Sequence, residues 1–191
     1  MKYRHVAQMG IVSALTIGLG VALAAQDRFT LKSPNGIAFS EFKGYDAWQV
    51  IAVSQPDDAE GCGSSKTGCI KAILGNPVMI KALSQGIPDN GKTVPDGAAM
   101  AKVEWLRKQN VASPYGVTVP GAQTEVGFMV KDSKRFPDTN GWGYATFQYD
   151  AASDTYKPAT NDATVMKSLC HACHTAGAKA RDFVYTSYAK R

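Results

Sequence analysis

The sequence has 191 residues, of which 45% are hydrophobic, and its formal net charge is +5 at neutral pH. This length and composition predict a folded chain with a core of its own and exclude a low-complexity or disordered protein. The modest positive charge does not indicate a nucleic-acid-binding protein, but it would favour docking to an acidic redox partner.

The first 24 residues have the pattern of a secretory signal peptide. Lys2, Arg4 and His5 make a basic start. An apolar run over residues 10–21 follows, and residues 22–24 fit the A-x-A pattern of a cleavage site. This run is too short to span a bilayer as a helix, and no later segment approaches that length. We therefore expect export to a bacterial periplasm without stable membrane insertion; an uncleaved anchor is the alternative.

Cleavage after residue 24 would leave residues 25–191 as a single domain, because no linker-like stretch or internal repeat divides them. The loss of Lys2 and Arg4 lowers the formal charge from +5 to +3. The histidines of this mature chain are then His171 and His174.

Cys62 and Cys69 flank a segment rich in glycine and serine, and neither is followed by a Cys-His pair. Disulfides persist in exported proteins, so we expect these cysteines to form one that restricts the loop between them. A free or metal-binding pair is the alternative.

Between residues 45 and 150 most of the sequence has the character of antiparallel strands. Apolar, β-branched and alternating segments predict strands over residues 47–54, 69–74, 98–106, 123–130 and 142–149. One helix is expected over residues 77–85, since Asn76 can serve as its N-cap, Pro77 suits its first position and Gly86 its end.

Side chains alternate between the two faces of a strand, and this places several polar residues together. Lys102 and Glu104 share one face of the strand predicted over residues 98–106, and Glu125 and Gly127 share one face of the next strand.

Near the end of the chain, Cys170-His171-Ala172-Cys173-His174 has the C-x-x-C-H pattern of covalent c-type haem attachment. Asn161 or Asp162 can cap a helix that runs into this motif. On such a helix Cys170, Cys173 and His174 lie on one face, so two thiols can bond the porphyrin vinyl groups while the imidazole reaches the iron. A redox dithiol would not need His174, and a zinc site would need further ligands.

His171 lies between the attachment cysteines and cannot reach the opposite face of the same porphyrin. The mature chain therefore offers no second histidine to a monomeric site. A methionine, a lysine or an open position remains for the sixth ligand; the methionines of the mature chain are Met79, Met100, Met129 and Met166. Methionine ligation would indicate electron transfer, and an open position would indicate ligand binding or catalysis.

Together these elements predict an α+β fold, mainly an antiparallel β-sheet with a few helices, whose C-terminal helix carries the haem motif. The chain resembles the cytochrome P-460 family, which includes the β-type cytochromes c′. The resemblance covers nearly the whole mature chain and is carried by residues 94–102, 129–136, 140–143, 170–174 and 182–186. It implies a homodimeric protein with one five-coordinate haem c held by His174.

The resemblance also implies roles for residues of the pocket. In P-460 members a lysine is bonded to a meso carbon of the porphyrin, and Lys102 matches that position; a buried lysine loses its charge readily and can then act as a nucleophile. The distal carboxylate of the family falls at Gly127, so Glu125 is the expected substitute, and Lys71 stands in place of a pocket arginine. Lys102, Glu125 and Lys71 could also be ordinary surface residues.

The leading hypothesis is therefore a periplasmic mono-haem oxidoreductase that oxidises hydroxylamine or a related small nitrogen species. Glu125 would remove protons, and electrons would leave to a soluble c-type cytochrome or similar acceptor. The alternative is a nitric oxide-binding β-type cytochrome c′ without turnover, and a methionine-ligated electron carrier is the third. Phe128, Met100 and Met129 are candidates for the distal wall, although all three could simply be core residues.

Overall fold

The structure is a computed structural model of the chain that describes residues 26–56, 62 and 68–188. The predicted signal peptide lies outside the described residues. Within the described ranges, no helix is both long and apolar enough to cross a membrane.

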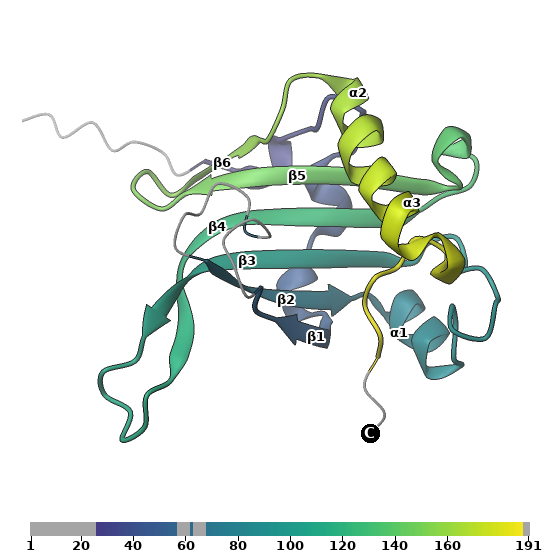
Figure 1. The fold of residues 1–191 in the computed structure, drawn as a ribbon. Coiled ribbons are helices and arrows are strands. Elements are labelled where there is room, and N and C mark those ends of the chain that lie inside the picture. Colours follow the sequence, from purple (N-terminus) through teal and green to yellow (C-terminus); the bar gives the residue numbers. More distant parts are fainter. Residues whose placement is uncertain (1–25, 57–61, 63–67, 189–191) are drawn as a thin grey trace, which may run out of the picture.

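Six antiparallel strands form a single sheet in which every strand pairs with its neighbour in the sequence (Figure 1). The strands are β1 (Gln49–Ser54), β2 (Cys69–Gly75), β3 (Ala99–Gln109), β4 (Thr118–Lys131), β5 (Trp142–Asp150) and β6 (Thr155–Pro158). The predicted α+β fold built on an antiparallel sheet is confirmed.

Two parts of the sheet were not predicted from the sequence. β4 begins at Thr118 because its first residues pair with the end of β3, although Pro120 and Gly121 are poor strand residues. The two register shifts between β3 and β4 accommodate this irregular part. β6 has only four residues and pairs with β5 at the edge of the sheet.

The predicted helix before β3 is present as α1 (Pro77–Ser84). The Asn76 side chain accepts a hydrogen bond from the backbone N–H of Met79 at 2.9 Å and so caps the first turn. Gly86 follows the helix with a φ of 78°, a left-handed conformation that favours glycine.

The N-terminal part of the described chain covers one face of the sheet with three short 3-10 turns, η1 (Arg28–Thr30), η2 (Phe39–Phe42) and η3 (Tyr45–Ala47) (Figure 1). An aromatic core fills this layer. The rings of Phe42 and Phe128 stack in parallel with their centroids 4.0 Å apart. The ring of Phe128 therefore packs in this core, which is the alternative that the sequence left open, although the residue also borders the cavity on the other face.

The C-terminal helix crosses the other face of the sheet (Figure 1). It consists of α2 (Ala163–Val165), a π-helical turn η5 (Met166–His171) and α3 (Ala172–Ala178), and the 3-10 turn η6 (Lys179–Arg181) follows. Asp162 caps its start by accepting the backbone N–H of Thr164 at 2.8 Å, one of the two caps expected. The haem motif is thereby placed over the middle of the sheet.

Candidate haem site

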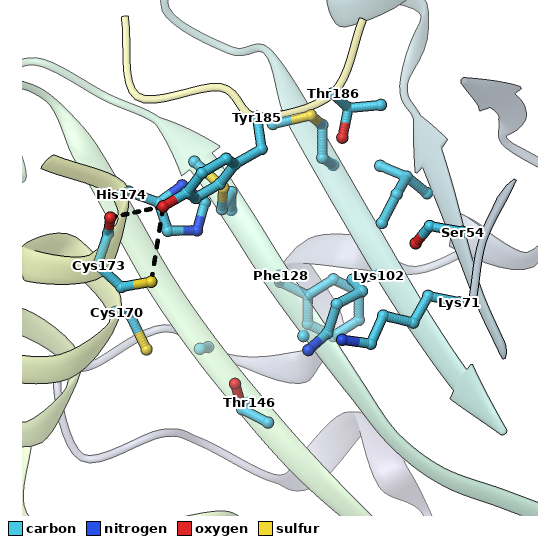
Figure 2. Close-up of a pocket in the computed structure, with 15 residues that line it drawn as sticks. Ser54, Lys71, Lys102, Phe128, Thr146, Cys170, Cys173, His174, Tyr185 and Thr186 are labelled. Carbon is cyan, nitrogen blue, oxygen red and sulfur yellow. Dashed lines mark hydrogen bonds between the residues drawn. The ribbon is translucent and has the colours of Figure 1, made fainter. Parts of the chain in front are cut away.

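A cavity of about 390 Å³ lies between the C-terminal helix, the sheet and the chain that follows the helix (Figure 2). This volume is within the range of small-molecule and cofactor sites. Strand residues line one wall, and helix and tail residues line the other: Ser54, Lys71, Ile73, Met100, Lys102, Gly127, Phe128, Met129, Ala145, Thr146, Cys170, Cys173, His174, Tyr185 and Thr186.

The three residues of the haem motif that would contact a porphyrin all face this cavity (Figure 2). Cys170 and Cys173 carry free thiols. Burial raises the pKa of the Cys170 thiol, so this sulfur is held as the neutral thiol. The hydroxyl of Tyr185 donates to the backbone carbonyl of Cys173 at 2.7 Å, which fastens the tail of the chain to the motif.

His174 is oriented by one hydrogen bond. Its Nδ1 lies 2.7 Å from the backbone carbonyl of Phe183. Because a carbonyl oxygen can only accept, Nδ1 carries the proton and Nε2 keeps its lone pair. Burial lowers the pKa of His174 and thus favours the neutral ring that a metal requires. Nε2 is therefore the atom available to an iron.

The other histidine of the motif is directed elsewhere. His171 Nδ1 lies 3.2 Å from the hydroxyl of Tyr144, and its ring packs 4.9 Å from that of Phe183. His171 is not among the residues that line the cavity. This agrees with the inference that it cannot serve as a second ligand.

Two lysines and two glutamates gather on the strand wall. The register places Lys71, Glu104 and Glu125 side by side on β2, β3 and β4. The Lys102 ammonium lies 2.9 Å from Glu125 Oε1 and 3.7 Å from Glu104 Oε2. The Lys71 ammonium lies 3.7 Å from the same Glu104 oxygen. The lysines line the cavity, and the carboxylates lie behind them.

Glu125 reaches the cavity through its ion pair with Lys102. It also borders a second cavity of about 410 Å³ that lies over β4, β5 and β6, together with Gln148 and Lys157. The predicted acid thus lies between the two cavities, where it could pass a proton from one to the other.

Glu104 was not assigned a role from the sequence. Its side chain is only 1% exposed, and its Oε2 accepts no hydrogen bond although two ammonium groups lie nearby. Burial raises the pKa of Glu104; Lys102 opposes this effect and Glu125 adds to it. The sequence signal that could have identified Glu104 is its place on the same strand face as Met100 and Lys102.

The protonation state of Lys102 differs from the expectation. Burial alone would lower the pKa of this ammonium, but Glu125 and Glu104 reverse the effect and raise it. The amine is therefore held in its charged form while it is paired with Glu125, and the expected neutral nucleophile is not present in this state. For Lys71, burial and the nearby Lys102 lower the pKa.

Gly127 leaves space for Lys102. It is the direct partner of Lys102 in the β3–β4 register, and a Cβ at Gly127 would lie 3.5 Å from Lys102 Cε. Met100 and Met129 flank this space and line the cavity, as expected for the distal wall. Met79 and Met166 lie in the apolar cluster of this face and do not line the cavity.

Outside the pocket, the structure joins Cys62 and Cys69 in a disulfide with a Cα–Cα distance of 5.4 Å. Cys69 is the first residue of β2, whose Lys71 lines the pocket. The bridge therefore fastens Cys62 to the first residue of a strand that forms the pocket.

The sequence profile of cytochrome P460 matches residues 42–186, which include the whole sheet and the C-terminal helix. The chain belongs to the cytochrome P460 family. A search of curated proteins gives no match.

Membership of the cytochrome P460 family implies a haem cofactor. The residues around the cavity under the C-terminal helix fit such a group, because two free thiols and one neutral imidazole with an available Nε2 face the same space. Lys102 lines that space as well.

Proposed function

We propose that this cytochrome P460 family member is an exported mono-haem c-type cytochrome that oxidises hydroxylamine or a related small nitrogen species. Cys170 and Cys173 would form the thioether links, and His174 Nε2 would bind the iron. The haem, when bound, would supply an iron that takes the substrate nitrogen and accepts its electrons.

The observation that supports this proposal is the group of two lysines and two glutamates on the strand wall of the pocket. Oxidation of hydroxylamine releases protons, and a pocket that supports it needs a group able to remove them. Glu125 is the candidate base because it is 2.9 Å from the Lys102 ammonium and borders the second cavity. A pocket that only held an uncharged gas would not need two lysines and two carboxylates on one wall.

Lys102 has two proposed roles. Its ammonium holds the Glu125 carboxylate beside the pocket wall through the 2.9 Å ion pair. Its place on the pocket wall also makes it the residue that would bond to the porphyrin edge, as in P-460 members. The bond would replace the meso C–H by C–N, a two-electron oxidation that needs an added oxidant of the peroxide class; the amine would lose its proton first, and Glu125 is the nearest acceptor for it.

The direct test is turnover by the protein loaded with haem during export. Addition of hydroxylamine together with ferricyanide or a soluble c-type cytochrome should reduce that acceptor at a rate proportional to the haem-loaded protein. Absence of hydroxylamine-dependent reduction, with full haem content, would refute the proposal.

Nitric oxide binding without turnover is the second candidate. It is favoured by the apolar part of the cavity, which Ile73, Met100, Met129 and Ala145 provide. This function predicts rapid formation of a nitrosyl complex, an unmodified haem spectrum, and a Lys102→Ala variant that behaves as the wild type does. A periplasmic location and a homodimer belong to both proposals, and dimerisation can be checked by sedimentation.

A further inference from the structure

The turn after the C-terminal helix presents the carbonyl that binds His174. Asp182 and Phe183 both adopt left-handed backbone conformations, with φ values of 46° and 65°. Neither residue is glycine, so this conformation is unfavourable by itself and requires support from its surroundings. The backbone N–H of Phe183 donates to Ala178 at 2.8 Å, and the Phe183 carbonyl is thereby directed at His174.

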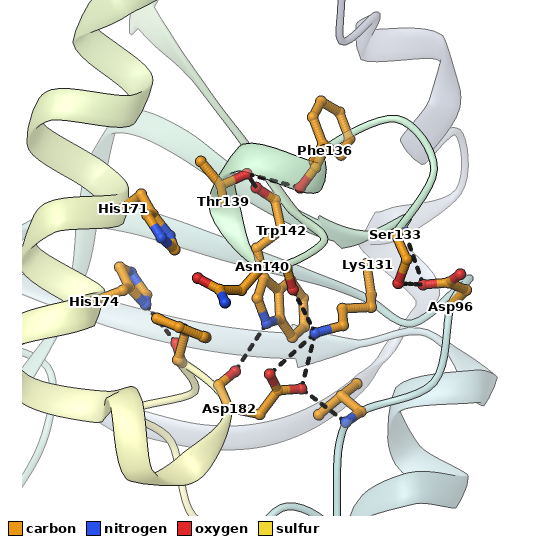
Figure 3. A network of polar contacts seen from close by, with 12 residues as sticks. Asp96, Lys131, Ser133, Phe136, Thr139, Asn140, Trp142, His171, His174 and Asp182 are labelled. Atoms are coloured by element: carbon orange, nitrogen blue, oxygen red, sulfur yellow. Dashed lines mark hydrogen bonds and ion pairs between the residues drawn. The ribbon is translucent and has the colours of Figure 1, made fainter.

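Asp182 is held by a buried polar network (Figure 3). Its two carboxylate oxygens accept hydrogen bonds from the Lys131 ammonium, each at 3.0 Å, and one of them also accepts the backbone N–H of Val94 at 2.8 Å. Its backbone carbonyl accepts the indole N–H of Trp142 at 2.8 Å. The side chains of Lys131 and Asp182 are 4% and 8% exposed, so this ion pair is almost wholly removed from water.

Lys131 is in turn fixed by the sheet. It is the last residue of β4 and pairs in register with Trp142, the first residue of β5. Its ammonium donates to the backbone carbonyl of Asn140 at 2.9 Å and lies 4.9 Å from the centre of the Trp142 ring. The position of Asp182 is therefore set by the rigid end of two central strands.

We propose that Lys131 and Asp182 are positioning residues for the iron ligand. They fix the left-handed turn, the turn fixes the Phe183 carbonyl, and that carbonyl sets the direction and the donor strength of His174. A strong hydrogen bond from Nδ1 increases the electron donation of Nε2 to a metal. The network would thus stabilise ferric iron and lower the reduction potential. This inference rests on the proposed role of His174 but not on hydroxylamine oxidation.

The Asp182→Asn variant tests the inference, because it removes the charge and keeps the size of the side chain. Resonance Raman spectra of the ferrous haem protein should show the iron–histidine stretch at a lower frequency than in the wild type, and the midpoint potential should be more positive. Glu41→Gln is the control, since it breaks the 2.6 Å ion pair with Arg135 on the other face of the sheet. Unchanged frequency and potential in Asp182→Asn would overturn the proposal.

A milder variant keeps the test decisive if Asp182→Asn does not load haem. Trp142→Phe retains a ring beside Lys131 but loses the donor to the Asp182 carbonyl, and it should shift both quantities in the same direction by a smaller amount. No shift in a folded Trp142→Phe protein would then refute the positioning role. Absence of an iron–histidine band from five-coordinate ferrous wild type would refute the ligand assignment itself, whereas failed turnover alone would leave the positioning role standing.

Discussion

Lys102 on β3 and Glu125 on β4 are diagonal neighbours across a strand pair, with Nζ and Oε1 2.9 Å apart. The direct register partner of Lys102 is Gly127, which has no side chain to meet it. The lysine therefore pairs with the acid two residues away. As a result, the candidate cross-linking group and the candidate base form one ion pair at the pocket wall.

Replacement of Lys102 by alanine should reveal whether the cross-link forms. We expect the dithionite-reduced wild type to absorb well to the red of an ordinary c-type haem, and Lys102→Ala to return the Soret band to its usual position. Visible spectra of both proteins, exported with the haem-maturation machinery, provide the measurement. Ordinary high-spin spectra in both would reduce Lys102 to a structural residue and favour nitric oxide binding.

Removal of the candidate base should slow turnover. Glu125→Gln keeps the shape of the side chain but cannot accept a proton, so we expect hydroxylamine oxidation to fall about 100-fold. The content of attached haem should stay unchanged, because Cys170, Cys173 and His174 keep their places at the cavity. Asp138→Asn is a suitable control, as the Asp138 side chain is 80% exposed. Equal rates in the wild type and Glu125→Gln would eliminate Glu125 as the base.

A carboxylate introduced at the position of the family's distal acid should restore part of that loss. Gly127 lines the cavity, and a Cβ there would make ordinary contacts of 3.5 Å and 3.6 Å with Lys102 and Thr146. We therefore expect Gly127→Glu in the Glu125→Gln background to recover activity. Gly127→Gln in the same background is the matched control and should remain slow.

The buried carboxylate of Glu104 should make stability depend on pH. Because burial raises its pKa above the unfolded value of 4.5, the folded state binds this proton more tightly than the unfolded state does. The stabilisation of the folded state that comes from this proton is complete below pH 4.5 and is lost as the pH rises through the higher folded pKa. Between pH 4 and about 8, the free energy of unfolding measured with urea should fall less in Glu104→Gln than in the wild type. The same pH dependence in both proteins would contradict this.

The aromatic core and the haem site should be separable by mutation. Phe128 is 2% exposed and stacks on Phe42, so Phe128→Ala should lower the free energy of unfolding by about 4 kcal/mol. Its side chain lies on the face of the sheet away from the haem motif, and we expect the visible spectrum of the folded variant to be unchanged. Denaturant unfolding followed by fluorescence and by absorbance measures both effects.

Much of the fold could be predicted from local patterns. The Asn76 cap, the Pro77 start and the Gly86 end of α1 depend only on neighbouring residues, and the structure contains all three. β6 and the first half of β4 are held by pairing with distant segments, and local propensity carries no information about such pairing.

The sequence predicted the part of the site that a motif determines. It did not predict the residues that only tertiary packing brings together. Cys170, Cys173 and His174 were placed together by their spacing alone. The sequence could not decide between a pocket and a core role for Phe128, and its stacking on Phe42 depends on tertiary packing. Neither the burial of Glu104 nor the Lys131–Asp182 pair follows from spacing, because each depends on which strands meet.

The order of strands in the sheet also bears on assembly. Every strand pairs with the one next to it in the chain, so the sheet and its aromatic layer can form from short-range hairpins. The haem-bearing helix packs on the opposite face of the sheet, and Tyr185 in the segment after it donates to the backbone carbonyl of Cys173. Haem attachment to Cys170 and Cys173 can therefore take place before this helix packs on the sheet. The folded sheet then provides the surface on which the haem-bearing helix docks.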